Sequence, residues 1–123
     1  MKKRLRLRRR TDFQRAMAGG RVYAARALVA FAVPSPAGQP HSRIGVTVSR
    51  RVRGAVARNR ARRRVREAAR LYFAADDSRP HEVGINLDMV LIARPEALTI
   101  GFDELRREVV GAARKGIARA GAP

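Results

Sequence analysis

Arginine dominates the possible chemistry of this chain, and it is concentrated in one stretch. Between residues 50 and 70 there are ten arginines and a single acidic residue, Glu67. A guanidinium group is planar, donates paired hydrogen bonds to phosphates or base edges, and stacks on bases. The stretch therefore predicts contact with a polymer that carries phosphate groups.

The composition of the whole chain supports the same prediction. Its 123 residues include 28 lysines and arginines against 10 acidic residues, which gives a net charge of +18. Such an excess repels itself, so it usually persists where a polyanion offsets it. The longest apolar run, residues 27–33, is far shorter than the roughly 20 residues of a membrane-spanning helix. Nucleic acid is the expected partner, and neither a membrane nor a small-molecule substrate is expected.

The arginines fall on one side of a predicted helix. At about 100° per residue, apolar side chains gather around Val65 and basic ones gather opposite. The apolar face consists of Ala61, Val65, Ala68, Ala69 and Tyr72, and the opposite face of Asn59, Arg63, Arg66 and Arg70. Arg62 and Arg64 flank the boundary, where we expect their charged heads to stay in solvent. An ordinary solvated helix face is the alternative, but acidic partners at helical spacing are scarce.

Groups that could catalyse a reaction or hold a metal are sparse. The absence of cysteine excludes disulfides, thiolate zinc sites and cysteine nucleophiles. His41 and His81 each follow a proline, and neither has an acid or nucleophile at a diagnostic spacing. Asp76 and Asp77 lack a third ligand at such a spacing. We therefore expect no catalytic residue and no metal held by the protein.

Apolar spacing also predicts the elements that position the arginine helix. Residues 11–14 (Thr-Asp-Phe-Gln) form a capping box that starts a short helix, which Gly19 and Gly20 end. Residues 26–33 are typical of a strand covered on both faces, and residues 43–49 of a strand with one open face.

The rest of the chain completes a small sheet with helices against it. Residues 76–88 predict a solvated connection, residues 89–93 a buried central strand, and residues 102–117 a closing amphipathic helix. The order helix, strand, strand, helix, strand, helix indicates an α/β (α+β) two-layer sandwich. Residues 1–123 are expected to form a single domain.

Two segments carry a family resemblance. Residues 43–51 read Arg-Ile-Gly-Val-Thr-Val-Ser-Arg-Arg, and residues 55–63 read Ala-Val-Ala-Arg-Asn-Arg-Ala-Arg-Arg. An Arg-Asn-Arg helix entered from such a strand resembles the bacterial ribonuclease P protein component. The resemblance extends over residues 3–117, because Asp-Phe-Gln at 12–14 and the later strand and helix keep the family's order.

The resemblance implies a fold and a function. The arginine helix would join two parallel strands by a left-handed crossover, in a fold class shared with a domain of a ribosomal protein. The protein would be the accessory subunit of an endoribonuclease that binds a catalytic RNA and the 5′ leader of precursor tRNA. The RNA, with its Mg²⁺ ions, would remove the leader to give the mature 5′ end of tRNA, and the polypeptide alone would be inactive.

The resemblance also assigns residues to the two RNA partners. The catalytic RNA would contact Arg58, Asn59, Arg60, Arg62, Arg63, Arg66 and Arg70. The leader would contact Phe13, Met17, Phe31, Ser49, Arg50, Arg51 and Arg94. Flat side chains that stack on bases, together with basic groups on phosphates, suit single-stranded RNA. Met17 departs from the aromatic residue that is common in the family, and the two phenylalanines could instead be core residues.

A basic structural protein of the ribosome, without a role in tRNA processing, is the alternative function. It would use the same arginine helix but would need no surface for a leader. The absence of cysteine, and of an apolar signal segment after the basic N-terminus, indicates a cytoplasmic protein in either case.

Overall fold

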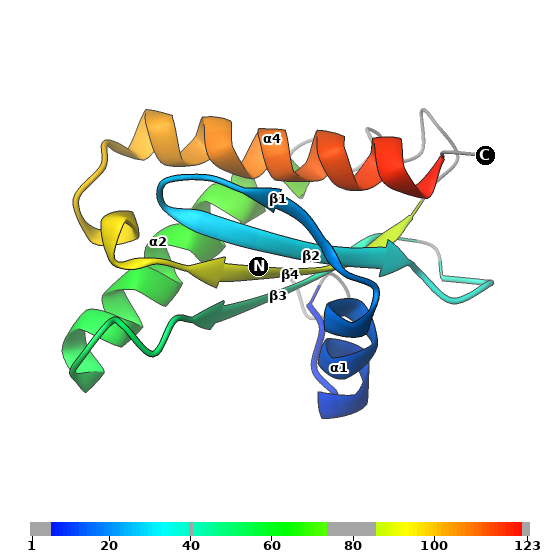
Figure 1. The fold of residues 1–123 in the computed structure, drawn as a ribbon, viewed down its shortest axis with the longest axis horizontal. Helices are drawn as coiled ribbons and strands as arrows, with labels where there is room; N and C mark the ends of the chain where they lie inside the picture. Colours follow the sequence, from blue (N-terminus) through cyan, green and yellow to red (C-terminus); the bar gives the residue numbers. More distant parts are fainter. Residues whose placement is uncertain (1–5, 40, 74–85, 122–123) are drawn as a thin grey trace.

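Three α-helices and four strands make up the computed structural model, which describes residues 6–39, 41–73 and 86–121 (Figure 1). In chain order the elements are α1 Arg10–Ala18, β1 Arg21–Ala24, β2 Leu28–Pro34, β3 Arg43–Val48, α2 Ala55–Phe73, β4 Leu87–Ala93, the 3₁₀-helix η2 Pro95–Leu98 and α4 Phe102–Ala120. Each predicted helix and strand is present, and β1 is an addition to the predicted order.

The four strands form one sheet in the order β1-β2-β4-β3. β2 is antiparallel to both β1 and β4, whereas β3 and β4 are parallel. Parallel neighbours need a long crossover connection, and α2 lies in that connection. The resemblance therefore predicted correctly that the arginine helix links two parallel strands.

β1 arises from tertiary contacts and not from a local pattern. Its four residues show no alternation of apolar and polar side chains. The strand pairs with β2, with Tyr23 opposite Ala30. Tyr23 also packs on α4 at Gly111, where a Cβ would lie only 2.8 Å from the tyrosine hydroxyl. Four residues carry too little periodicity to predict such a strand.

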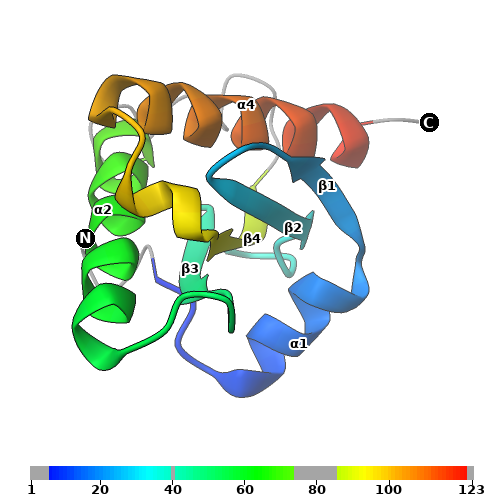
Figure 2. The ribbon, with the colours of Figure 1, turned by 60° about the vertical axis from the view of Figure 1, so that its left-hand side comes forward.

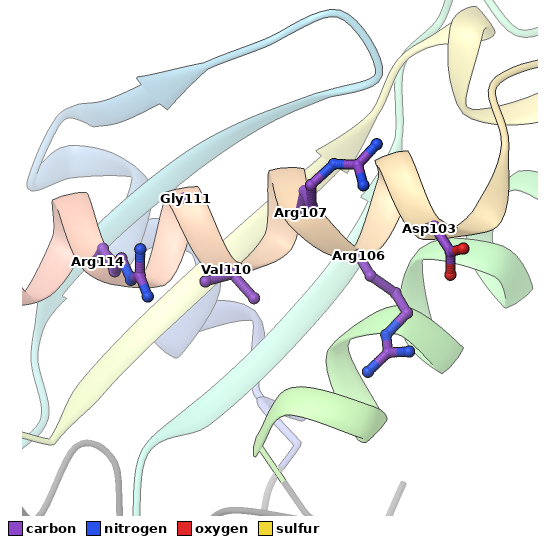
Figure 3. A pocket seen from close by; sticks show the side chains of 6 residues that line it. All are labelled: Asp103, Arg106, Arg107, Val110, Gly111 and Arg114. Carbon is purple, nitrogen blue, oxygen red and sulfur yellow. The ribbon is translucent and has the colours of Figure 1, made fainter.

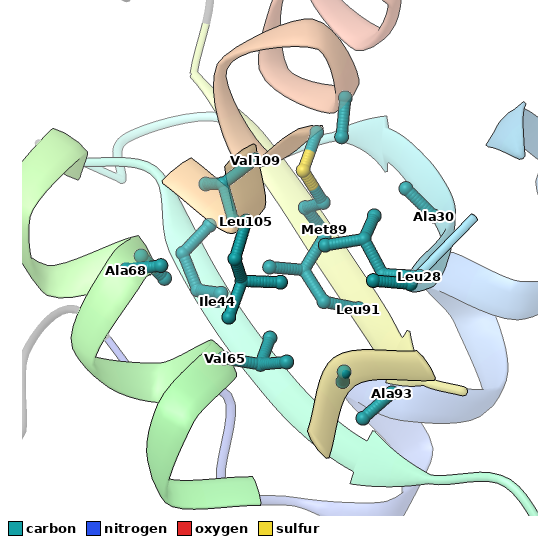
Figure 4. Close-up of a cluster of buried hydrophobic side chains, with 14 of the residues drawn as sticks. Leu28, Ala30, Ile44, Val65, Ala68, Met89, Leu91, Ala93, Leu105 and Val109 are labelled. Carbon is teal, nitrogen blue, oxygen red and sulfur yellow. The ribbon is translucent and has the colours of Figure 1, made fainter. Parts of the chain in front are cut away.

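The main hydrophobic core lies between the sheet and the two long helices. α2 and α4 cover the same face of the sheet (Figure 2). Alternate residues of a strand point to one face, so Leu28 and Leu91 meet Val65 of α2 and Leu105 of α4 (Figure 4). Burying each such side chain contributes roughly 1.5–3 kcal/mol. This core holds the apolar face of α2 inward and turns its arginines outward.

α1 covers part of the opposite face of the sheet (Figure 2). A second buried cluster forms there from Leu7, Ala16 and Val90. Phe13 and Phe31 are partly buried against it. β3 approaches α1 so closely that a Cβ on Gly45 would lie 2.5 Å from the Phe13 ring. The predicted open face of residues 43–49 was therefore wrong at this position, because a helix covers it.

β2 is fully buried on one face only. Leu28, Ala30 and Ala32 are buried, whereas Val29, Phe31 and Val33 are partly exposed. The prediction of a strand covered on both faces was therefore wrong for the second face. The reason is that α1, with nine residues, is too short to cover all of it.

α1 begins without the predicted capping box. Arg9 is the N-cap residue, and its side chain makes no capping hydrogen bond. The N–H of Phe13 donates instead to the carbonyl of Arg9 at 3.2 Å. Thr11, which was predicted to cap the helix, lies one residue inside it and is exposed. The predicted end is confirmed, since Gly20 has a φ of 100°, a conformation that favours glycine.

β4 is longer than predicted. It begins at Leu87 rather than at residue 89, and its second residue, Asp88, has a fully buried side chain. The earlier part of the predicted connection, residues 76–85, lies outside the described residues. No helix within the described ranges is long and apolar enough to cross a lipid bilayer.

Candidate nucleic-acid interface

α2 has the orientation that its sequence predicts. Its inward residues Ala61, Val65, Ala68 and Ala69 are buried, and Tyr72 is partly buried. On the outward side Asn59, Arg60 and Arg63 are exposed, and Arg62, Arg66 and Arg70 are partly exposed. The first turn contains no acidic residue. The partial positive charge of the helix N-terminus therefore adds to the charge of the arginines.

Arg58 and Arg64 use their guanidinium groups inside the protein. Arg58 donates to three carbonyl oxygens within residues 48–52 at 2.9 to 3.2 Å, which ties the start of α2 to the end of β3. Arg64 donates to the carbonyls of Ala97 (2.5 Å) and Ile100 (2.9 Å). The expectation that the Arg64 head stays in solvent was wrong, because one carbonyl oxygen of η2 and one of the segment between η2 and α4 lie within its reach.

The outward arginines of α2 have few partners. In the described part of the protein the one ion pair made by α2 joins Arg70 to Glu67 at 2.6 Å, and the two side chains keep 42% and 50% of their surface exposed. Arg62 donates to the amide oxygen of Asn59 at 2.9 Å. An exposed ion pair is worth little in water. The face therefore keeps nearly all of its positive charge available for an anionic partner.

The segment before α1 adds to this basic face. Arg6 forms a parallel β-bridge with Ile44, and the N–H of Leu7 donates to the Ile44 carbonyl at 2.9 Å. The bridge brings Arg6 close to Arg66 of α2. Burial, followed by the like charges of Arg6 and Arg62, lowers the pKa of Arg66. The protein thus gathers cations from two distant segments, and no carboxylate of the described residues forms an ion pair with Arg6 or Arg66.

Three of the residues assigned to the leader lie near α1. Phe13 and Phe31 are partly buried against the second cluster, whereas Met17 is 40% exposed. Each phenylalanine therefore serves in packing and also presents part of its side chain to solvent. The three side chains come from α1 and from β2, on the same side of the sheet.

The other four assigned residues gather where β3 and β4 end. The N–H of Ser49 donates to the carbonyl of Ala93 at 2.9 Å, so Ser49 and Arg94 follow neighbouring strand ends. Arg50 and Arg51 are exposed in the turn after β3. Because the strands are parallel, their carboxyl ends bring these polar groups to one edge of the sheet.

One row of side chains on the sheet lies between the residues near α1 and the residues that follow β3 and β4. The strand register places Val29, Ile92 and Thr47 side by side, and each is partly exposed. At about 3.3 Å per residue, the four steps from Gly45 to Ser49 span roughly 13 Å. We name this the α1-side surface: it runs from Phe31 beside α1, across the row, to Ser49 and Arg94.

Asp88 is an important residue of this side that the sequence analysis did not identify. Its buried carboxylate accepts hydrogen bonds from Arg43 Nε (3.0 Å), Arg43 Nη2 (2.6 Å) and Ser35 Oγ (2.9 Å), and it pairs with Arg15 of α1. The hydrogen bond to Asp88 is the main cause of the raised pKa of Arg43. A lone carboxylate at the start of an apolar strand is the one signal that the sequence offers.

The described residues contain no group of three or more histidine, aspartate or glutamate side chains placed to hold a metal ion. Asp76, Asp77 and His81, considered in the sequence, lie outside those residues.

Comparisons with known proteins agree with this architecture. The chain matches the family described as Ribonuclease P over residues 1–116. The ribonuclease P protein component of Symbiobacterium thermophilum is 42% identical over 109 residues, which is 89% of this chain and 88% of that protein.

Two solved structures share the fold. A Staphylococcus aureus RNase P protein mutant with defective mRNA degradation activity has a TM-score of 0.71 at 26% identity, over 95% of this chain and 90% of that one. For the Thermotoga maritima RNase P protein the TM-score is 0.65 at 27% identity, over 89% and 96%. The chain therefore belongs to the bacterial ribonuclease P protein family, the protein components of an endoribonuclease that processes tRNA.

Proposed function

We propose that the protein binds the catalytic RNA of ribonuclease P through the outward face of α2. The observation that carries this proposal is the face itself, on which guanidinium groups reach solvent and, apart from the pair at Arg70, have no carboxylate partner among the described residues. Each such group can bind a phosphate and release its counterions. Asn59, Arg60, Arg62, Arg63 and Arg66 are the proposed contacts. Arg58 supports them by holding the start of the helix.

The 5′ leader of precursor tRNA is proposed to lie along the α1-side surface. Phe13, Met17 and Phe31 offer side chains on which bases can stack or pack, at one end of the surface. Arg50, Arg51 and Arg94, together with Ser49, offer donors for phosphates at the other end. The length of roughly 13 Å suits a short single-stranded segment. The protein would thereby orient the leader relative to the catalytic RNA.

The protein is proposed to contribute affinity and orientation, and not catalytic groups. Mg²⁺ bound by the RNA would supply the activation of water for attack on the phosphodiester. The polypeptide alone should therefore be inactive. We also propose that the protein is located in the cytoplasm with its RNA partners.

Cleavage of end-labelled precursor tRNA at low Mg²⁺ concentration tests the function. Three reactions are compared: the catalytic RNA alone, the protein alone, and the two together. We expect rapid cleavage at the mature 5′ end in the mixture, slow cleavage by the RNA alone and none by the protein alone. Equal rates with and without the protein would contradict the proposal and favour the ribosomal alternative.

A matched pair of variants shows whether α2 is responsible. Arg63→Gln with Arg66→Gln removes two charges from the arginine face, and Arg21→Gln with Arg26→Gln removes two charges from the exposed β1–β2 hairpin. The first variant should need a higher protein concentration to stimulate cleavage, and the second should behave as the unmodified protein.

A further inference from the structure

The outer face of α4 is a second basic surface, distinct from the arginine face of α2. Arg106, Arg107 and Arg114 line a hollow of about 540 Å³ together with Asp103, Val110 and Gly111 (Figure 3). On α2, Arg64 is directed toward η2 and the start of α4, whereas Arg66 neighbours Arg6 on the other side. The arginine face of α2 therefore points away from α4, and the two surfaces are separate.

The positive charge of this hollow is not neutralised by the described part of the protein. Asp103 precedes Arg106 and Arg107 by three and four residues, a spacing at which ion pairs form on helices. Even so, no described carboxylate oxygen lies within 4.0 Å of any of the three guanidinium groups. The acid next to Arg107, Glu108, is turned inward, where it is 8% exposed and accepts the Ala27 N–H at 2.9 Å.

The shape of the face is as important as its charge. Arg106 and Arg107 leave α4 on opposite sides, with Arg106 directed toward α2 (Figure 3). Of the residues between Arg107 and Arg114, Val110 and Gly111 line the hollow, whereas Glu108, Val109, Ala112 and Ala113 are buried. Gly111 must stay small, because a Cβ would lie 2.8 Å from the Tyr23 hydroxyl. Contact with Tyr23 thus keeps this position free of a side chain, and Arg106 and Arg107 lie on the two flanks of the helix (Figure 3).

We propose that the outer face of α4 binds double-stranded RNA, with the helix along the minor groove and its arginines on the two phosphate strands. The minor groove of an A-form duplex is wide and shallow, and proteins recognise it by shape and by phosphate and 2′-hydroxyl contacts. Val110 and Gly111, which line the hollow with the arginines, are small and let the helix approach this groove. Arg107 and Arg114 are seven residues apart, about 10 Å along the helix and on the same flank, so they contact phosphates of the same strand independently of base sequence.

This surface goes beyond the proposed contacts of α2 and the α1-side surface, and it rests on the proposed function only in taking RNA as the partner. A fluorescence-anisotropy titration measures the Kd of a labelled RNA duplex of about 16 base pairs at several salt concentrations. Arg107→Gln with Arg114→Gln is compared with Arg21→Gln and Arg26→Gln, which remove the same charge from the hairpin.

The α4 variant should bind the duplex several-fold more weakly, and its slope of log Kd against log salt should fall by about two, one for each arginine. The hairpin variant should keep the slope of the unmodified protein. Ala118→Glu gives a second test, because Ala118 is exposed four residues after Arg114 and a carboxylate there would face the phosphates. Circular dichroism of each variant confirms that it is folded.

An unchanged slope in the α4 variant would overturn the inference, as would an equal loss of affinity for a single strand of the same length, which has no groove. Failure of the proposed function is recognised separately, by full stimulation of precursor cleavage by Arg63→Gln with Arg66→Gln. The two experiments therefore distinguish an error about α4 from an error about α2.

Discussion

Asp88 and Arg43 form a bidentate pair at the buried start of β4, with contacts of 3.0 Å and 2.6 Å. The two residues are direct neighbours in the parallel register of β3 and β4. The same carboxylate also pairs with Arg15 of α1. One buried charge thus joins the sheet to the helix that carries Phe13 and Met17, and so positions one end of the α1-side surface.

Asp88→Asn should lower the free energy of unfolding by about 3 kcal/mol, because Arg15 and Arg43 lose the buried carboxylate with which they pair. Urea unfolding followed by circular dichroism measures the change. Asp103→Asn is the matched control: Asp103 is exposed and forms no ion pair with a described residue, so the change should stay within about 0.5 kcal/mol. Equal losses in the two variants would contradict the structural role of Asp88.

Gly45→Ala should destabilise the protein by about 1–3 kcal/mol, because the new methyl group would lie 2.5 Å from the Phe13 ring and push α1 off the sheet. Gly101→Ala is the control, since a Cβ there meets no atom within 4 Å. Thermal unfolding distinguishes them. If both variants melt at the temperature of the unmodified protein, α1 does not pack on β3 as described.

Glu108 should make stability depend on pH. Burial raises the pKa of Glu108 in the folded protein, so the folded state binds a proton more tightly than the unfolded chain does. The contribution of Glu108 to stability therefore increases as the pH falls from neutral through the raised pKa, and becomes constant below the ordinary value.

Glu108→Gln removes the buried charge and keeps an oxygen that can accept the Ala27 N–H. We expect a higher Tm at pH 7 and a smaller gain near about pH 4. Asp103→Asn, which changes the net charge equally at an exposed position, serves as the reference. A gain in Tm that is the same at both pH values would show that Glu108 does not titrate abnormally.

Arg63 and Arg64 are adjacent arginines with opposite expected effects. Arg63→Gln should reduce the salt dependence of binding to the catalytic RNA by about one charge and leave the Tm unchanged, because Arg63 is exposed. Arg64→Gln should lower the Tm and leave the salt slope unchanged, because its guanidinium binds the carbonyls of Ala97 and Ile100. Filter binding over a salt series, with a melting curve for each variant, checks both. If Arg63→Gln lowered the Tm and Arg64→Gln reduced the salt slope, α2 would be rotated about its axis, with Arg63 facing the protein and Arg64 facing solvent.

Phe31→Ala should weaken the binding of precursor tRNA more than that of mature tRNA, by about 1–3 kcal/mol if one stacked base is lost. The measurement is the ratio of the two Kd values, with Phe31→Leu as a variant that keeps most of the packing volume. An equal loss for both RNAs, in a protein that remains folded, would assign Phe31 to the hydrophobic cluster alone.

The sequence by itself determined those parts of the protein that depend on near neighbours. The apolar residues around Val65 recur at helical spacing, so the direction of the arginine face of α2 followed from residues within three turns. The three longer strands and the closing helix were predicted for the same reason. Charge and composition pointed to a nucleic-acid partner. The Arg-Asn-Arg resemblance narrowed the partner to RNA and predicted the parallel strands that α2 connects.

Only the tertiary structure decided what each polar side chain does. Arg63 and Arg64 are the same residue type in the same helix, yet it is Arg64 that donates hydrogen bonds to carbonyl oxygens more than 30 positions away, while Arg63 is exposed. Asp88 pairs with Arg15, which lies 73 positions earlier in the chain. β1 forms because it pairs with β2 and packs against α4. Local spacing tells which face a residue occupies. Hydrogen-bond partners are set by segments that folding brings together, and no local pattern encodes them.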